Sequence, residues 1–228
     1  MDSVFLKEMD VLSAYCEFVA SESIYENMVF MEASNDPSKS IVDAIRAKIE
    51  VAIQKINAFF QKINERIHHM IVKYQTKHAT DVRKIGEYKF VMKECNDAYR
   101  KYLTDMKGIL RKEMAERSYK KNKDRNVGAM MMQSNAANAK RKCMKTVQKV
   151  LDKAAKMNAS QLDLLSDDMF GEIKKYAVQF QNDLSVYAIS HQKDLSSNDS
   201  MSITAMSLEA GNTCYEISKA ILSLKSAK

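Results

Sequence analysis

Glu65 and His68 have the spacing that comes closest to a known chemistry. A Glu and a His three residues apart share one helix face, and helical bundles use two such pairs with two further carboxylates to hold two metal ions. The chain has no second Glu-x-x-His. Ile67, not His68, also continues the apolar seam described below. We therefore interpret the pair as part of a solvated polar face and predict no metal site.

Other catalytic and cofactor motifs are absent from the sequence. It has no GxxxxGK[ST], GxGxxG or GxSxG, and its five glycines leave little material for a phosphate-binding loop. The sequence contains no CxxC pair, so it indicates neither a zinc site nor a redox motif. We expect its cysteines to be buried free thiols in a reducing compartment. The sequence thus predicts a protein that is not an enzyme, with no catalytic residue and no cofactor. The four scattered cysteines are Cys16, Cys95, Cys143 and Cys214.

Basic residues suggest the sharpest alternative, a contact with DNA or RNA. Between Arg100 and Arg125 there are ten basic residues and four acidic ones. Such a region can neutralise phosphates in a salt-sensitive, sequence-tolerant way. No helix-turn-helix, zinc-finger or RNA-recognition signature accompanies it, and a solvated helix face is the simpler interpretation. The candidate nucleic-acid-binding residues are Arg111, Lys112, Lys120, Lys121, Lys123, Arg125, Lys140, Arg141 and Lys142, and a second cluster continues through Lys145, Lys149, Lys153 and Lys156.

The net charge of +7 conceals three regions of different sign. Residues 1–36 hold one lysine and eight acids, residues 37–160 hold 29 basic residues and 12 acids, and residues 161–228 hold six lysines and nine acids. These regions predict an acidic N-terminal helical segment, a basic long-helix region and a C-terminal helical pair within one continuous helical domain. The charge pattern indicates either an anionic partner or mutual neutralisation by packing or self-association.

Composition and periodicity predict an all-α fold. The chain has one proline and five glycines, too few for the turns of a strand-rich protein. We expect an elongated bundle or coiled-coil-like assembly of five to six helices, two of them long, with self-association to complete its apolar stripes. The expected helices cover residues 2–32, 41–74, 82 to about 125 and 129–157, a fifth from Ser160 or Ser166 to about 194, and a last one at 201–224 after a 196–200 loop.

The clearest helix, over residues 41–74, carries its apolar residues at steps of three and four. This spacing places them along one side, where they must pack against other helices. The predicted helix-packing seam comprises Ile45, Ile49, Ile56, Phe59, Ile63 and Ile67.

Residues 30–75 resemble a family of phage proteins. The segments that carry the resemblance are Phe30-Met31-Glu32-Ala33, Ile41-Val42-Asp43-Ala44-Ile45 and the Ile/Lys/Phe-rich run from Ile53 to Ile63. They look like head-associated or internal virion proteins of large tailed phages that infect Gram-positive bacteria. The resemblance implies a non-enzymatic structural component that packs against other virion proteins or DNA. It also implies that head-maturation proteases could cut between Glu32 and Ala33.

No window approaches the roughly 20 apolar residues of a membrane span. The N-terminus lacks the basic and apolar regions of a Sec signal. Acids dilute the lysines of the 41–74 helix, so membrane-surface contact is not expected. We expect the protein in the virion or the host bacterial cytoplasm. The alternatives are a cytoplasmic helical adaptor or scaffold that binds a protein partner and a sequence-nonspecific nucleic-acid-binding protein.

Overall fold

The structure is a computed structural model that describes residues 11, 14, 15, 41–77, 88–119, 125–159, 161–193 and 195–225. Within these ranges the fold is all-α, with five packed α-helices and no strand. Three helices exceed 30 residues: α2 (Ile41–Lys77), α3 (Lys89–Tyr119) and α4 (Arg125–Lys156). Two shorter helices, α5 (Gly171–Ser190) and α6 (Ser197–Leu222), follow a 3-10 turn, η2 (Gln161–Leu164).

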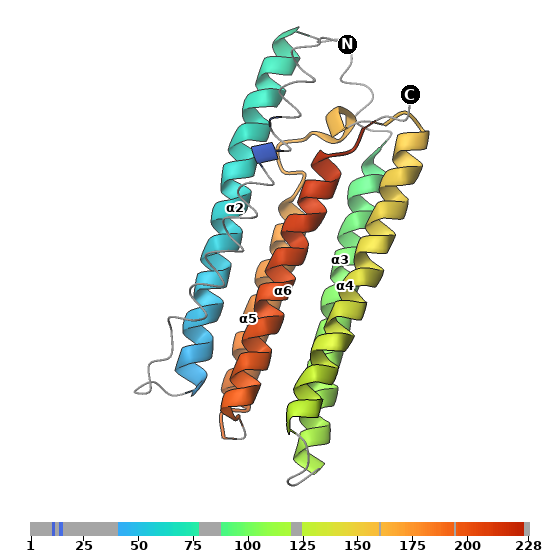
Figure 1. Ribbon diagram of the computed structural model, residues 1–228. Helices are drawn as coiled ribbons and strands as arrows, with labels where there is room; N and C mark the ends of the chain where they lie inside the picture. The colour runs from blue at the N-terminus through green and yellow to red at the C-terminus, as the bar shows by residue number, and fades with distance from the viewer. Residues whose placement is uncertain are drawn as a thin grey trace.

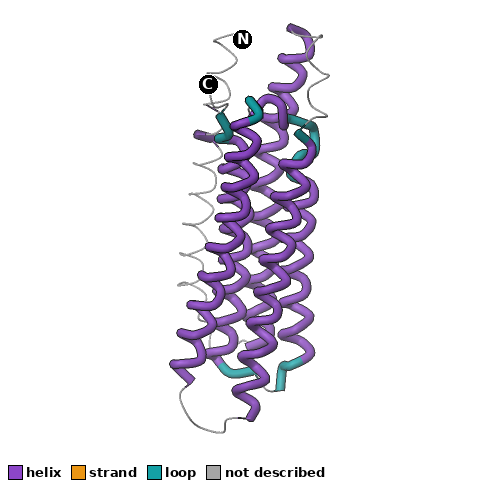
Figure 2. The backbone as a smooth tube through the Cα atoms, turned by 90° about the vertical axis from the view of Figure 1, so that its right-hand side faces the viewer, coloured by secondary structure: helices purple, strands orange, loops and turns teal. Residues whose placement is uncertain are grey.

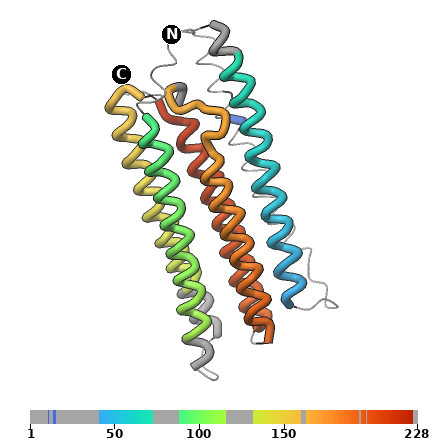
Figure 3. Tube along the Cα trace, turned by 180° about the vertical axis from the view of Figure 1, so that it is seen from behind, coloured from blue at the N-terminus to red at the C-terminus, as the bar shows by residue number. Residues whose placement is uncertain are grey.

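The helices form an elongated bundle in three layers, with α2 on one side, α5 and α6 in the middle, and α3 and α4 on the other side (Figure 1). Successive helices run in opposite directions along the bundle axis (Figures 1 and 3). The view in Figure 2 shows that the helices stay nearly parallel along the whole length. α2 packs on α5 and α6, while α4 packs on α3 and α6. The C-terminal hairpin therefore separates α2 from the α3–α4 hairpin.

α6 is the central helix, because it packs against α2, α3, α4 and α5. Its buried positions include several small polar residues, which let neighbouring helices approach. Thr204 donates to the Ser200 carbonyl at 2.7 Å and Ser218 to the Cys214 carbonyl at 2.9 Å. Such hydrogen bonds to a carbonyl of the preceding turn satisfy a hydroxyl group that is buried away from water. α6 can therefore be buried on nearly every side despite its polar composition.

The predicted seam of α2 is buried along its whole length. Ile45, Ile49, Ile56, Phe59, Ile63 and Ile67 are each at most 1% exposed. The Phe59 ring lies 4.3 Å from that of Tyr215 on α6 and 5.0 Å from that of Phe60. Phe60 in turn lies 5.9 Å from Phe170 at the start of α5. The seam thus joins α2 to both helices of the middle layer.

The helix that was expected to begin at residue 129 begins earlier. α4 starts at Arg125, so Asn126, Val127 and Gly128 lie within its first turn. A single glycine costs only about 1 kcal/mol even in the interior of a helix, so Gly128 does not prevent a helical start at Arg125. At the other end, Asn158 adopts a left-handed φ of 61° and Ala159 N–H donates to the Ala154 carbonyl at 2.9 Å. This C-terminal motif ends α4 at Lys156.

The last two helices also differ from the expected boundaries. α5 begins at Gly171 rather than near Ser160 or Ser166, because the connection is held by the buried side chains of Leu164, Leu165 and Phe170. It ends at Ser190. The expected loop at residues 196–200 is the first turn of α6, where Ser196 and Asp199 form a reciprocal capping box.

Other expectations fall largely outside the described residues. Val11, Ala14 and Tyr15 are helical, and the Arg66 guanidinium lies 4.1 Å from the Tyr15 ring centroid. The rest of the expected 2–32 helix and the Glu32–Ala33 junction are not described.

Candidate functional site

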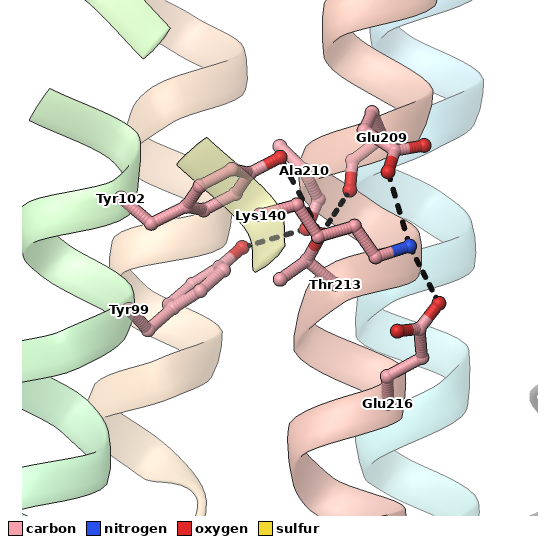
Figure 4. Close-up of polar contacts among 7 residues, drawn as sticks. All are labelled: Tyr99, Tyr102, Lys140, Glu209, Ala210, Thr213 and Glu216. Carbon is pink, nitrogen blue, oxygen red and sulfur yellow. Dashed lines mark hydrogen bonds and ion pairs between the residues drawn. The ribbon is translucent and has the colours of Figure 1, made fainter. Parts of the chain in front are cut away.

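Two tyrosines of α3 reach the central helix through the interior of the bundle (Figure 4). The Tyr99 hydroxyl donates to the Ala210 carbonyl at 2.8 Å. The Tyr102 hydroxyl lies 3.4 Å from Thr213 Oγ1, which itself donates to the Glu209 carbonyl at 2.7 Å. Burial raises the pKa of both tyrosines, so both stay protonated at neutral pH. Their polar atoms are already used to fix α3 against α6.

Lys140 forms a three-member ion cluster between α4 and α6 (Figure 4). Its Nζ lies 2.7 Å from Glu216 Oε1 and 3.0 Å from Glu209 Oε1. Burial alone would lower the pKa of Lys140, but the hydrogen bonds of Glu216 and Glu209 outweigh it and the pKa is raised. An amine held in its charged form is a poor base or nucleophile at neutral pH. This arrangement therefore pairs two helices rather than performing a reaction.

A third polar contact joins the two helices of the middle layer. Gln181 and Ser207 are both buried, and Gln181 Nε2 donates to the Ser207 carbonyl at 2.9 Å. The Ser207 hydroxyl donates back to Gln181 Oε1. If α5 slid along α6, the buried Gln181 amide would lose both hydrogen bonds to Ser207. This pair of bonds therefore fixes the register of α5 against α6.

The cysteines of α3 and α4 are buried thiols. Cys95 and Cys143 are 0% and 5% exposed, and burial raises the pKa of each to about 12. Reactive cysteines need the thiolate and access to solvent. These two therefore contribute packing. The Cys214 thiol donates to the Gly211 carbonyl at 2.9 Å, and Cys16 is not described.

Near the Glu65–His68 pair the structure brings one further carboxylate, that of Asp167. Glu65 accepts a bond from Gln61 at 3.0 Å, while His68 Nδ1 lies 2.8 Å from Asp167 Oδ1 with both side chains exposed. Within the described residues no group of three or more His, Cys, Asp or Glu side chains could hold a metal ion.

Among the described helices, α4 carries the most one-sided charge. From residue 141 to its end, this helix has six basic residues and one acid, Asp152. All six basic residues are exposed. At about 100° per residue they fall within an arc of about 120°, so they share one face. Asp152 lies within the same arc and accepts a hydrogen bond from Gln148 at 2.8 Å. We call this set the α4 basic face: Arg141, Lys142, Lys145, Lys149, Lys153 and Lys156.

The structure distributes the nine candidate nucleic-acid-binding residues over different environments. Arg111 and Lys112 are exposed on α3, and Arg141 and Lys142 are exposed on α4. Lys140 instead pairs with two glutamates of α6. The side chains of Lys120, Lys121, Lys123 and Arg125 are not described.

Helical geometry could have separated these residues before the structure was known. Lys140 lies about 100° from Arg141, on the side away from the centre of the α4 basic face. Its partners Glu209 and Glu216 are far away in the chain, so no local pattern indicates them. The same count of about 100° per residue places four cations outside the candidate set on the α4 basic face: Lys145, Lys149, Lys153 and Lys156.

None of the helices that the structure describes is long and apolar enough to span a membrane. Comparison with known proteins adds no relative: no family model, no curated protein and no solved structure matches the chain.

Proposed function

We propose that this protein is a non-enzymatic helical structural component of a phage virion, which packs against other virion proteins or DNA. The observation that carries this proposal is the use of the interior polar groups. Tyr99, Tyr102 and Lys140, which could otherwise act as acids or bases, are engaged in contacts that join α3 and α4 to α6. Because these interior groups hold the helices together, they support the interpretation that the protein is a rigid body that acts through its surface.

The virion assignment is supported by the resemblance over residues 30–75. Most of that region is α2, whose seam is buried against α5 and α6. The Ile/Lys/Phe-rich pattern thus has a structural role in this chain. Self-association is part of the proposal, because charged regions of opposite sign can meet between copies.

Purified phage particles provide the test. We expect the chain in particles banded on a density gradient, at a constant copy number relative to the major capsid protein and after nuclease treatment of the surface. Recovery only in the host soluble fraction, bound to a host protein, would contradict the proposal and favour the adaptor alternative.

The N-terminal sequence of the protein recovered from particles tests the processing hypothesis separately. A chain that begins at Ala33 supports cleavage after Glu32. A chain that begins at Met1 or Asp2 removes the cleavage hypothesis but leaves the structural role in place.

A further inference from the structure

We propose that the α4 basic face binds the phosphate backbone of double-stranded DNA. This inference rests on the proposed function, since it names one of the two classes of partner given there. The α4 basic face is not the same as the set of candidate nucleic-acid-binding residues named from the sequence. It excludes Lys140, and it extends along α4 to Lys156.

The dimensions of the face suit a duplex backbone. Residues 141 and 156 are separated by about 22 Å along the helix axis. Duplex DNA carries about one negative charge for each 1.7 Å of its axis, so that length offers about a dozen phosphates to six cations. Within the described part of the chain, no carboxylate forms an ion pair with Lys142, Lys145, Lys149 or Lys156. None of the described carboxylates therefore competes with phosphates for these four side chains.

The inner side of α4 holds the face rigidly. Cys143, Val147 and Ala154 are buried, and α4 packs on both α3 and α6. The Lys153 ammonium lies 4.8 Å from the Phe90 ring centroid of α3, which restrains that side chain while its residue remains exposed. Binding then needs no folding step, and less conformational entropy is lost.

The residue types on the face favour duplex over single-stranded DNA. Residues 141–156 include no aromatic residue. Single-strand binding proteins stack bases on aromatic rings, whereas contacts from Lys and Arg to phosphates fix position without reading sequence. We therefore expect sequence-independent binding that prefers the regular duplex backbone.

α3 provides the internal comparison, because its charges are mixed. Over Lys89–Tyr119 it has eight basic residues and five acids, and Lys101 pairs with Asp105 at 3.8 Å. An acidic protein surface would be a competing partner for the α4 basic face. However, the acids that this structure sets against α4, Glu209 and Glu216, are bound by Lys140 on a different side of the helix.

The test measures binding of the full chain to a fluorescent duplex of about 24 base pairs as a function of salt concentration. The variant Lys145→Gln/Lys149→Gln/Lys156→Gln removes three charges from the face. The control Lys93→Gln/Lys101→Gln/Lys175→Gln removes three exposed charges from α3 and α5. Circular dichroism and thermal unfolding verify that both variants fold.

If all six cations contact phosphates, the slope of log K against log salt is about −5, and the first variant reduces its magnitude by about 3. Its affinity at about 50 mM salt should fall on the order of tenfold or more, while the control keeps the parent slope. Single-stranded DNA of the same sequence should bind more weakly than the duplex.

Three results would overturn the inference: no duplex binding at low salt, equal losses in the variant and the control, or displacement of the duplex by polyglutamate as readily as by unlabelled duplex. Loss of DNA binding in a chain that is present in particles overturns this inference alone. Absence from particles, with the titration as expected, overturns the proposed function instead.

Discussion

Neighbouring cations on one helix have different roles when they lie at different angles. Lys140 pairs with two carboxylates of α6, whereas Arg141 and Lys142 are exposed. The Lys140 side chain is 23% exposed and those of Glu209 and Glu216 are 35% and 40% exposed. Solvent therefore screens this cluster partly, and its contribution lies between those of surface and buried ion pairs.

Replacing Lys140 by Met removes the charge and keeps most of the aliphatic side chain. We expect the free energy of unfolding to fall by about 1 to 2 kcal/mol, because Glu209 and Glu216 then repel each other without a cation. Urea unfolding followed by circular dichroism measures the change. Lys142→Met is the matched control and should stay within about 0.5 kcal/mol. Equal effects of the two substitutions would show that the cluster contributes nothing.

Cys95 and Cys143 make stability depend on pH in the alkaline range. In the folded chain their pKa is about 12, against 9.0 for an ordinary thiol, so above pH 9 the unfolded chain binds fewer protons. The free energy of unfolding must then fall as pH rises, by up to about 1.4 kcal/mol per pH unit for each thiol. Well below pH 9.0 both states keep the thiol proton, and this contribution is constant.

Urea unfolding between pH about 8 and about 9.5 tests this dependence below the ordinary tyrosine pKa of 10.0. The variant Cys95→Ala/Cys143→Ala should lose most of the slope, whatever its absolute stability. A slope unchanged in the variant would mean that other groups cause the decline.

At the scale of elements, α2 depends on its aromatic positions. Phe59 is 1% exposed and its ring contacts Phe60 and Tyr215. Phe59→Ala should lower the free energy of unfolding by about 3–5 kcal/mol, because a large cavity opens between α2 and α6. Chemical denaturation measures the loss. Gln54→Ala, at an exposed position of the same helix, should stay within about 0.5 kcal/mol. A loss below about 1 kcal/mol for Phe59→Ala would contradict enclosure of the ring.

The helical class and the seam of α2 could be predicted because periodicity is a local property. Steps of three and four from Ile45 to Ile67 require one buried side wherever the partner helix comes from. Helix ends were predicted less well, because the same residue types occur both in loops and in helix caps. Ser196 to Ser200 have turn-forming side chains, but Ser196 and Asp199 use them to cap α6.

The polar contacts between helices could not be predicted in the same way. Tyr99 bonds to Ala210 and Lys140 to Glu216, pairs that are separated by 111 and 76 residues. Which helix faces which is decided by the packing of the whole bundle. The serines and threonines of α6 give it a composition that is typical of a helix on the surface. In the structure α6 is instead buried among α2, α3, α4 and α5.

At the scale of the whole molecule, stability should be highest along α6. Because α6 packs against the other four long helices that the structure describes, its amide hydrogens should become accessible only when the bundle unfolds as a whole. Native-state hydrogen exchange measures this by region. We expect amides of residues 203–218 to exchange more slowly than those on the outer face of α4. Equal rates in α6 and α4 would show that the helices open together or that α6 is not central.

The order of the helices along the chain has a consequence for synthesis. A ribosome releases α2, α3 and α4 before α6, yet α2 shares its extensive packing with α5 and α6 rather than with the hairpin. α3 and α4 can pack on each other early, but α2 has no described partner until translation reaches α5 and α6. A message that ends before α5 would leave the apolar seam of α2 uncovered, and the product would be a substrate for chaperones and proteases rather than a smaller working protein.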